Sequence, residues 1–268
     1  NNVLIVGSGT GNDTAYGIQK GVNKIDAVEI DPVIIDIGKK YHPQQPYQSN
    51  KVNVIQNDAR NFIQHTNNKY DLIVYGLLDS HSSLSGKGGI RLDSYVYTVE
   101  ALKESKKILN KNGYISLSFY LSEPELGSKI YLMLKQAFNG REPLVVSQSS
   151  GNDQEFRSQP YAFLIGNNID KNLDISNSGL TKVSFFSDKN NLSNVDVSTD
   201  NWPFFYMPSK VWPKSYIFII FLIFVSSFFF IQNTNPINKK NFSPTCFFLG
   251  SGFMLVETKG ITELALVF

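Results

Sequence analysis

The hydrophobic pattern of the first 166 residues alternates short apolar runs with longer stretches whose apolar residues recur at helical spacing. This alternation predicts buried strands separated by helices, the pattern of a mostly parallel sheet covered on both faces. The predicted fold is therefore α/β: a Rossmann-like, doubly wound, mostly parallel sheet of seven strands. The strands are expected near residues 2–6, 24–29, 52–56, 70–75, 113–120, 144–148 and 161–165, and the helices near 13–21, 32–40, 59–65, 94–109 and 124–138.

The pattern changes twice further along the chain. We predict a first domain over residues 1–168 and an irregular, polar extension of it over 169–210. Residues 211–268 predict a membrane segment, because apolar residues dominate a helix at about 213–232 and a second, truncated helix at about 244–268. A buried core helix is the alternative for the first of these. Since the chain starts inside a core strand and stops inside an apolar run, we expect a fragment of a longer protein.

Composition narrows the function classes. Hydrophobic residues make up 42% of the chain and charged residues 18%, which is typical of a globular protein. The net charge of +2 gives no electrostatic argument for nucleic-acid binding, so no nucleic-acid partner is predicted. The single cysteine excludes an internal disulfide, and the three scattered histidines show no ligand spacing, so no metal site is predicted either.

A glycine-rich turn follows the first predicted strand. Gly7, Ser8, Gly9 and Gly11 occupy the end of an apolar run, where missing side chains let the backbone approach a ligand. Asn12 stands where a dinucleotide fingerprint has its third glycine, which argues against a dinucleotide and for a cofactor without a pyrophosphate.

Acidic residues end the next two predicted strands. Glu29 is placed to bind ribose hydroxyls, and Asp58 is placed to accept a hydrogen bond from an adenine amino group. Either acid alone would be explained as a solvated loop carboxylate, but successive strand ends converge on one crevice and predict a nucleoside pocket. Further predicted cofactor contacts are Ile30, Ala59 and Gly76.

These motifs resemble the class I S-adenosylmethionine-dependent transferase fold, and in particular the spermidine synthase family. The resemblance rests on residues 3–11, 28–33 and 58–62. The Trp-Pro-Phe at 202–204 and the Glu-Thr-Lys at 257–259 resemble a multi-spanning membrane branch of that family.

The resemblance has one departure, at the end of the fourth predicted strand. The family places there an Asp that helps to deprotonate the attacking amine, and this chain has Gly76 at that position. Asp79 and His81 are the predicted catalytic replacements, since a histidine near neutral pKa suits proton removal. A role for His81 in capping or ordering its loop is an equal alternative.

The resemblance implies a membrane-anchored transferase that uses S-adenosylmethionine or decarboxylated S-adenosylmethionine. Its implied partners are a small amine or other nucleophile and the lipid bilayer, and a homodimer is left open. The implied location is a multi-pass inner or plasma membrane, with the transferase domain in the cytoplasm. Two alternatives stay open: a methyltransferase, and a catalytically lapsed nucleoside-binding regulatory domain on a transporter-like membrane protein.

Overall fold

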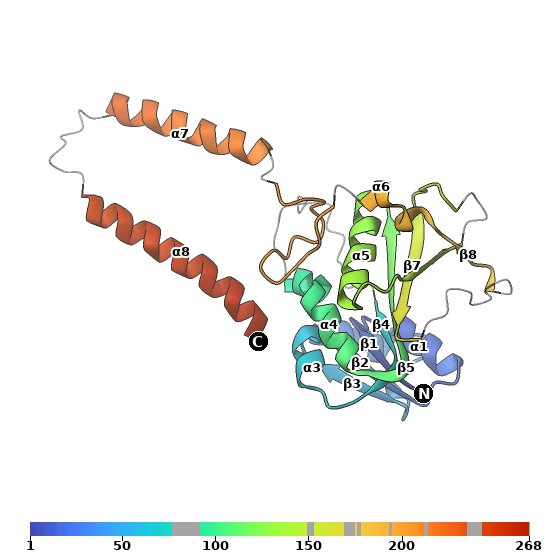
Figure 1. Ribbon diagram of the computed structural model, residues 1–268. Helices are drawn as coiled ribbons and strands as arrows, with labels where there is room; N and C mark the ends of the chain where they lie inside the picture. The colour runs from blue at the N-terminus through green and yellow to red at the C-terminus, as the bar shows by residue number, and fades with distance from the viewer. Residues whose placement is uncertain are drawn as a thin grey trace. The chain divides into compact units, whose positions relative to one another are not determined.

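The computed structural model describes residues 1–76, 92–148, 153–168, 175, 178–192, 195–211, 214–234 and 243–267. The chain divides into two compact units, Asn1–Ser209 and Lys210–Phe268. The first unit is an α/β sheet with helices on its faces, as the alternating pattern predicts (Figure 1).

The sheet has eight strands in the order β3-β2-β1-β4-β5-β7-β6-β8. The strands are β1 (Asn2–Val6), β2 (Lys24–Glu29), β3 (Val52–Gln56), β4 (Tyr70–Tyr75), β5 (Leu109–Leu121), β6 (Leu144–Ser147), β7 (Gln159–Gly166) and β8 (Thr181–Lys182). The first five pair in parallel, and β7, β6 and β8 complete the sheet with antiparallel pairs. The parallel part therefore brings the carboxyl ends of β3, β2, β1 and β4 to one edge, in that order.

Helices cover both faces of this sheet. They are α1 (Asn12–Gln19), α2 (Pro32–Tyr41), α3 (Ala59–His65), α4 (Val99–Lys107), α5 (Pro124–Ala137) and α6 (Lys189–Leu192), with short 3-10 segments η1 (Pro46–Gln48), η2 (Leu92–Tyr97) and η4 (Phe185–Ser187). Successive residues of β1 alternate between the faces. Leu4 and Val6 join the large core under α4 and α5, while Val3 and Ile5 pack in a smaller core with Tyr47.

Two sequence predictions about this fold are corrected. The sheet has eight strands and mixed orientation, where seven mostly parallel strands were expected; β8 has two residues, too few for a periodic pattern. The helix expected over 94–109 is broken into η2 and α4, because Thr98 caps α4 by accepting a hydrogen bond at Oγ1 from Ala101 N at 3.2 Å.

The aromatic stretch after residue 200 packs into the first unit. The Phe205 ring stacks on Tyr97 with centroids 4.7 Å apart and lies 5.5 Å from Phe119. The fully buried Lys129 of α5 donates from Nζ to the carbonyl oxygens of Phe204 and Met207, both at 2.6 Å. These contacts hold the stretch against α5 and the sheet.

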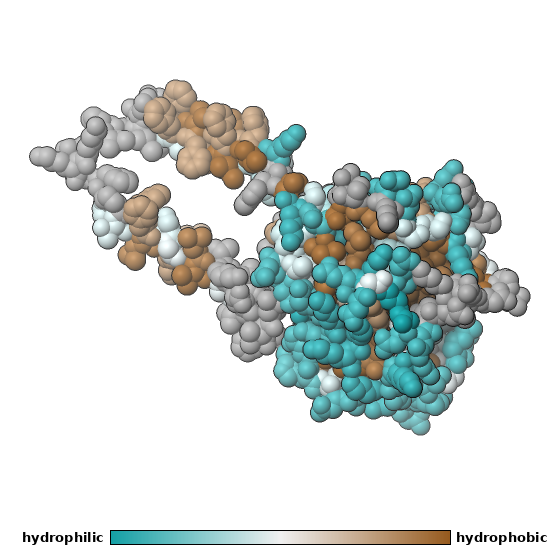
Figure 2. Space-filling view, viewed as in Figure 1, coloured by the Kyte–Doolittle hydropathy of each residue, from teal (hydrophilic) through white to brown (hydrophobic). Residues whose placement is uncertain are grey.

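The second unit contains α7 (Lys214–Thr234) and α8 (Pro244–Val267), where membrane-spanning helices were predicted. Most of their described large apolar side chains are exposed, and Figure 2 shows them in brown. Even so, no helix in the described part of the chain combines the length and the apolarity that a membrane span requires. The apolar run at 216–231 is shorter than the roughly 20 residues needed, and the charged Glu257 interrupts the other. This finding contradicts the predicted membrane localisation and the predicted transmembrane helices.

Candidate functional site

The glycine turn lies between β1 and α1, at the carboxyl edge of the sheet. Gly7, Gly9 and Gly11 have φ values of 70°, 56° and 105°, a backbone region that favours glycine. A Cβ built on Gly11 would lie 2.7 Å from Pro46 Cγ, so this glycine is packed closely. A Cβ on Gly9 would meet no atom of the described chain within 4 Å. The Gly9 backbone therefore faces open space, where a ligand could approach it.

Glu29 ends β2 and holds this turn. Its Oε2 accepts a hydrogen bond from Gly9 N at 2.9 Å, and its Oε1 accepts from Ile30 N at 2.9 Å and Asp31 N at 3.1 Å. The residue is buried, with 8% of its surface exposed. A carboxylate offers about four acceptor positions, and the described residues occupy three of them, which leaves one for a ligand hydroxyl.

Tyr47 of η1 braces the turn from the other side, a role that no sequence motif indicated. Its hydroxyl donates to Gly9 O at 2.6 Å and hydrogen-bonds with Ser8 Oγ at 2.9 Å. Desolvation raises the pKa of Tyr47, the Ser8 hydrogen bond lowers it, and the charges of Glu29 and Asp13 raise it further. The net rise keeps the phenol protonated as a donor.

The other predicted cofactor residues lie on neighbouring elements. Asp58 caps α3, because its Oδ1 accepts from Asn61 N at 2.9 Å, and its side chain is half-buried. Ala59 is buried in the first turn of that helix, whereas Ile30 is 55% exposed beside Glu29. Asn57 N donates to Glu29 O at 3.1 Å and ties the end of β3 to that of β2. Among the described residues, the Asp58 side chain forms no hydrogen bond with the glycine turn, so its adenine-binding role stays a prediction.

Gly76 follows β4 and lies against the start of the glycine turn. Its N donates to Val6 O at 3.0 Å, and a Cβ built on it would lie 2.7 Å from Gly7 O. No side chain fits at this position without moving the turn. Asp79 and His81 lie outside the described residues, so their catalytic roles also stay predictions.

We expect Gly76→Ala to lower the free energy of unfolding by about 1–3 kcal/mol, because the added methyl group must push a backbone carbonyl of the turn. Urea denaturation measures this. Gly17→Ala in α1 is the matched control, since its Cβ would come 2.9 Å from the flexible tip of the Ile25 side chain. Equal stability of the two variants would contradict the tight approach at Gly76.

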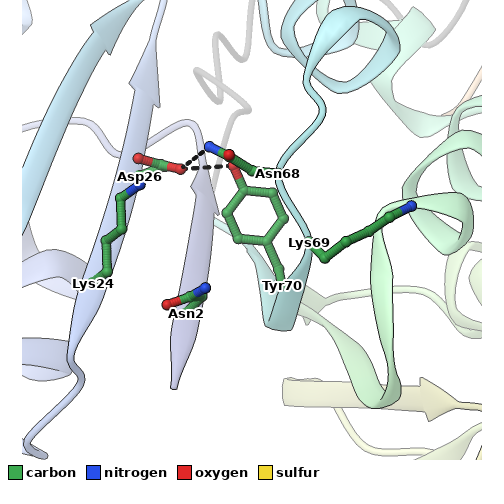
Figure 3. Close-up of a pocket in the computed structure, with 6 residues that line it drawn as sticks. All are labelled: Asn2, Lys24, Asp26, Asn68, Lys69 and Tyr70. Atoms are coloured by element: carbon green, nitrogen blue, oxygen red, sulfur yellow. Dashed lines mark hydrogen bonds between the residues drawn. The ribbon is translucent and has the colours of Figure 1, made fainter.

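The opposite edge of the sheet carries a small polar pocket, lined by Asn2, Lys24, Asp26, Asn68, Lys69 and Tyr70 (Figure 3). The buried Asp26 accepts hydrogen bonds from Tyr70 Oη at 2.7 Å, Asn68 Nδ2 at 3.1 Å and Asn53 Nδ2 at 3.0 Å. Burial and the Asp26 carboxylate raise the pKa of Tyr70. The Asp26 carboxylate thus accepts three hydrogen bonds from neighbouring side chains, and Lys69 Nζ donates to Lys107 O at 2.6 Å, so we assign this group a structural role.

Comparison with known proteins identifies the family of the domain that contains the glycine turn and Glu29. The sequence model of the family described as "Spermine/spermidine synthase domain" matches residues 1–149, more than half of the chain. The chain belongs to the spermine/spermidine synthase family. A polyamine aminopropyltransferase of Buchnera aphidicola is 36% identical over 119 residues, which cover 43% of this chain and 41% of that protein. The chain thus spans about two-fifths of the length of the curated relatives that it matches.

Solved structures agree on the fold of this spermine/spermidine synthase family member. A spermidine synthase from Thermotoga maritima covers 80% of the chain with a TM-score of 0.51 and 16% identity. A probable spermidine synthase from Corynebacterium glutamicum covers 79% with a TM-score of 0.54 and 14% identity. At such identities the similarity shows the fold alone. The predicted family and Rossmann-like fold are confirmed, and the multi-spanning branch receives no support from these relatives.

Proposed function

We propose that this protein is an aminopropyltransferase that takes decarboxylated S-adenosylmethionine and a small amine as its substrates. The observation that carries the proposal is the hydrogen bond from Gly9 N to Glu29 Oε2. It joins an open glycine turn to a carboxylate at the edge where doubly wound sheets bind nucleosides. Family membership and the names of the curated relatives support the same reaction class.

The proposed reaction is a direct displacement. The amine nitrogen bonds to the aminopropyl carbon attached to sulfur, and the carbon–sulfur bond breaks with its electron pair returning to sulfur. The nitrogen then loses a proton, and the products are an aminopropylated amine and methylthioadenosine. The sulfonium is already an activated leaving group, so the protein mainly contributes positioning of the two substrates.

Each residue of the site has a proposed task in this positioning. Glu29 holds the turn and uses its remaining acceptor position for a ribose hydroxyl. The exposed Ile30 offers an apolar surface to the adenine ring, and Asp58 offers a carboxylate oxygen to the adenine amino group. Asp79 and His81 are the proposed contacts to the attacking amine, and a homodimer remains an expectation.

A second candidate function is nucleoside binding without transfer. It is favoured by Gly76, because no carboxylate can project from this point toward the reacting groups without moving the turn. The glycine turn and Glu29 would then serve a regulatory domain that senses the nucleoside.

One experiment separates the two functions. The full chain is incubated with decarboxylated S-adenosylmethionine and a diamine, and products are identified by mass spectrometry. Methylthioadenosine formed together with the aminopropylated diamine is the expected result. Calorimetric binding of methylthioadenosine without turnover favours the second candidate, and methyl transfer from S-adenosylmethionine identifies a methyltransferase. If the protein binds none of these nucleosides, the proposed site is wrong.

A further inference from the structure

The ends of β1 and β4 lie side by side next to the glycine turn. A ligand bound at the turn would extend past this point. β1 and β4 pair in parallel up to Val6 and Tyr75. Gly7 and Gly76 are therefore neighbouring residues, each the first after its strand. Because the Gly7 carbonyl fills the space in which a Gly76 side chain would start, neither residue contributes a charge there. Any charged group at this point must come from another element.

Asp13, in the first turn of α1, reaches this point. Its Oδ2 lies 3.5 Å from the position of a Cβ on Gly76. The same carboxylate acts electrostatically on Tyr47, as Glu29 does, so both acids face the turn. Asp13 is an exposed residue, but local desolvation raises the pKa of its carboxyl.

No positive group offsets the Asp13 carboxylate among the described residues. The turn itself contains no lysine, arginine or histidine. The side chain of the adjacent Asn12 hydrogen-bonds through Oδ1 with His42 Nε2 at 3.0 Å. Glu29 adds a second negative charge, and its hydrogen bonds are to neutral backbone groups. The described residues therefore make this end of the site negative, and a cationic ligand would offset that charge.

We propose that Asp13 is a specificity-determining residue whose carboxylate contacts the cationic end of the bound nucleoside and selects a cationic adenosyl sulfonium over a neutral adenosine thioether. This inference rests on the proposed function, because decarboxylated S-adenosylmethionine carries its positive charges on the sulfonium and the terminal ammonium. Methylthioadenosine has the same nucleoside and neither charge. The helix dipole also favours an acid in the first turn of α1, so a purely structural role must be distinguished.

The test is calorimetric titration of the full chain with both nucleosides, in the natural protein and in Asp13→Asn. The natural protein is expected to bind both. Asp13→Asn is expected to weaken binding of decarboxylated S-adenosylmethionine by about tenfold or more, the effect of losing one charge-assisted contact. Binding of methylthioadenosine should stay within about twofold, since it has no charge to lose a partner.

Asp36→Asn is the matched control, because Asp36 is also an exposed helical acid, on α2. It should leave both affinities unchanged, and thermal unfolding of both variants reports any structural effect. If Asp13→Asn weakens the binding of both ligands equally, or weakens the binding of neither, the inference is overturned while the proposed function stands. Failure of the natural protein to bind either nucleoside overturns the proposed function and this inference with it.

Discussion

Replacing Arg60 by Met is expected to lower the free energy of unfolding of the first unit by about 3 kcal/mol, the lower end of the range for breaking a buried ion pair. Arg60 is 5% exposed and lies in α3. Its guanidinium contacts Asp200 Oδ2 at 2.9 Å and Glu104 Oε2 at 2.6 Å. Both carboxylates lose their partner in the variant, but each keeps about a quarter of its side chain in water, which moderates the loss.

The Arg60 cluster joins three parts of the chain. The guanidinium also donates to Tyr95 O at 2.8 Å and to Thr98 Oγ1 at 3.0 Å, at the junction of η2 and α4. Desolvation lowers the pKa of Arg60, but the hydrogen bonds and charges of Asp200 and Glu104 outweigh it and raise the pKa. The Arg60 side chain is therefore charged in the folded protein.

Urea denaturation followed by circular dichroism measures this loss. Lys135→Met is the matched control, because Lys135 pairs with Glu142 at 3.1 Å with 35% and 34% of the side chains exposed. Such an exposed pair contributes about 0–1 kcal/mol. If the two variants lose the same stability, the Arg60 cluster does not hold Asp200 to α3 and α4.

The sequence predicted the parallel half of the fold well, because its signals are local. The apolar runs that become β1, β2, β3 and β4 end within a residue of the predicted limits. The helix at 94–109 was predicted too long, since Thr98 interrupts it with a side-chain cap that depends on the packing around Arg60. Asn112-Gly113 is a turn-forming pair, and it lies inside β5 where the register with β4 shifts between Leu109 and Tyr114, so the local preference appears as an irregularity in the strand.

In the candidate site, too, the residues marked by local sequence signals were predictable and those held by distant contacts were not. The glycine turn and Glu29 were predictable, because a strand, its turn and the next strand end lie within 29 residues. Tyr47 was not, since its contact with Gly9 spans 38 residues and no motif marks it. The Arg60–Asp200 contact spans 140 residues and has no local signature either. Asp13 carried a weak signal, an acid in the first turn after a glycine loop, which a helix N-terminus explains equally well.

Glu29→Ala is expected to have the second-largest effect, a loss of about 2–3 kcal/mol in the free energy of unfolding, because three backbone N–H groups lose a charged acceptor. The loss should be accompanied by loss of nucleoside binding. Gly9 N is one of the three groups, so the turn loses the contact that fixes it beside β2. Tyr47 still holds Gly9 O from the other side, which keeps the variant folded enough to be measured.

Measuring stability with and without ligand separates the loss of folding stability in Glu29→Ala from its loss of nucleoside binding. With methylthioadenosine at about a hundred times its dissociation constant, the natural protein should gain about 2.7 kcal/mol of stability from binding to the folded state alone. Glu29→Ala should gain nothing at that concentration. Glu125→Ala, which removes an exposed acid of α5, should keep the full gain and change stability by less than about 0.5 kcal/mol. The opposite result is that Glu29→Ala loses stability without ligand but gains as much stability from the nucleoside as the natural protein does. Glu29 would then only brace the turn, and another residue would recognise the ribose.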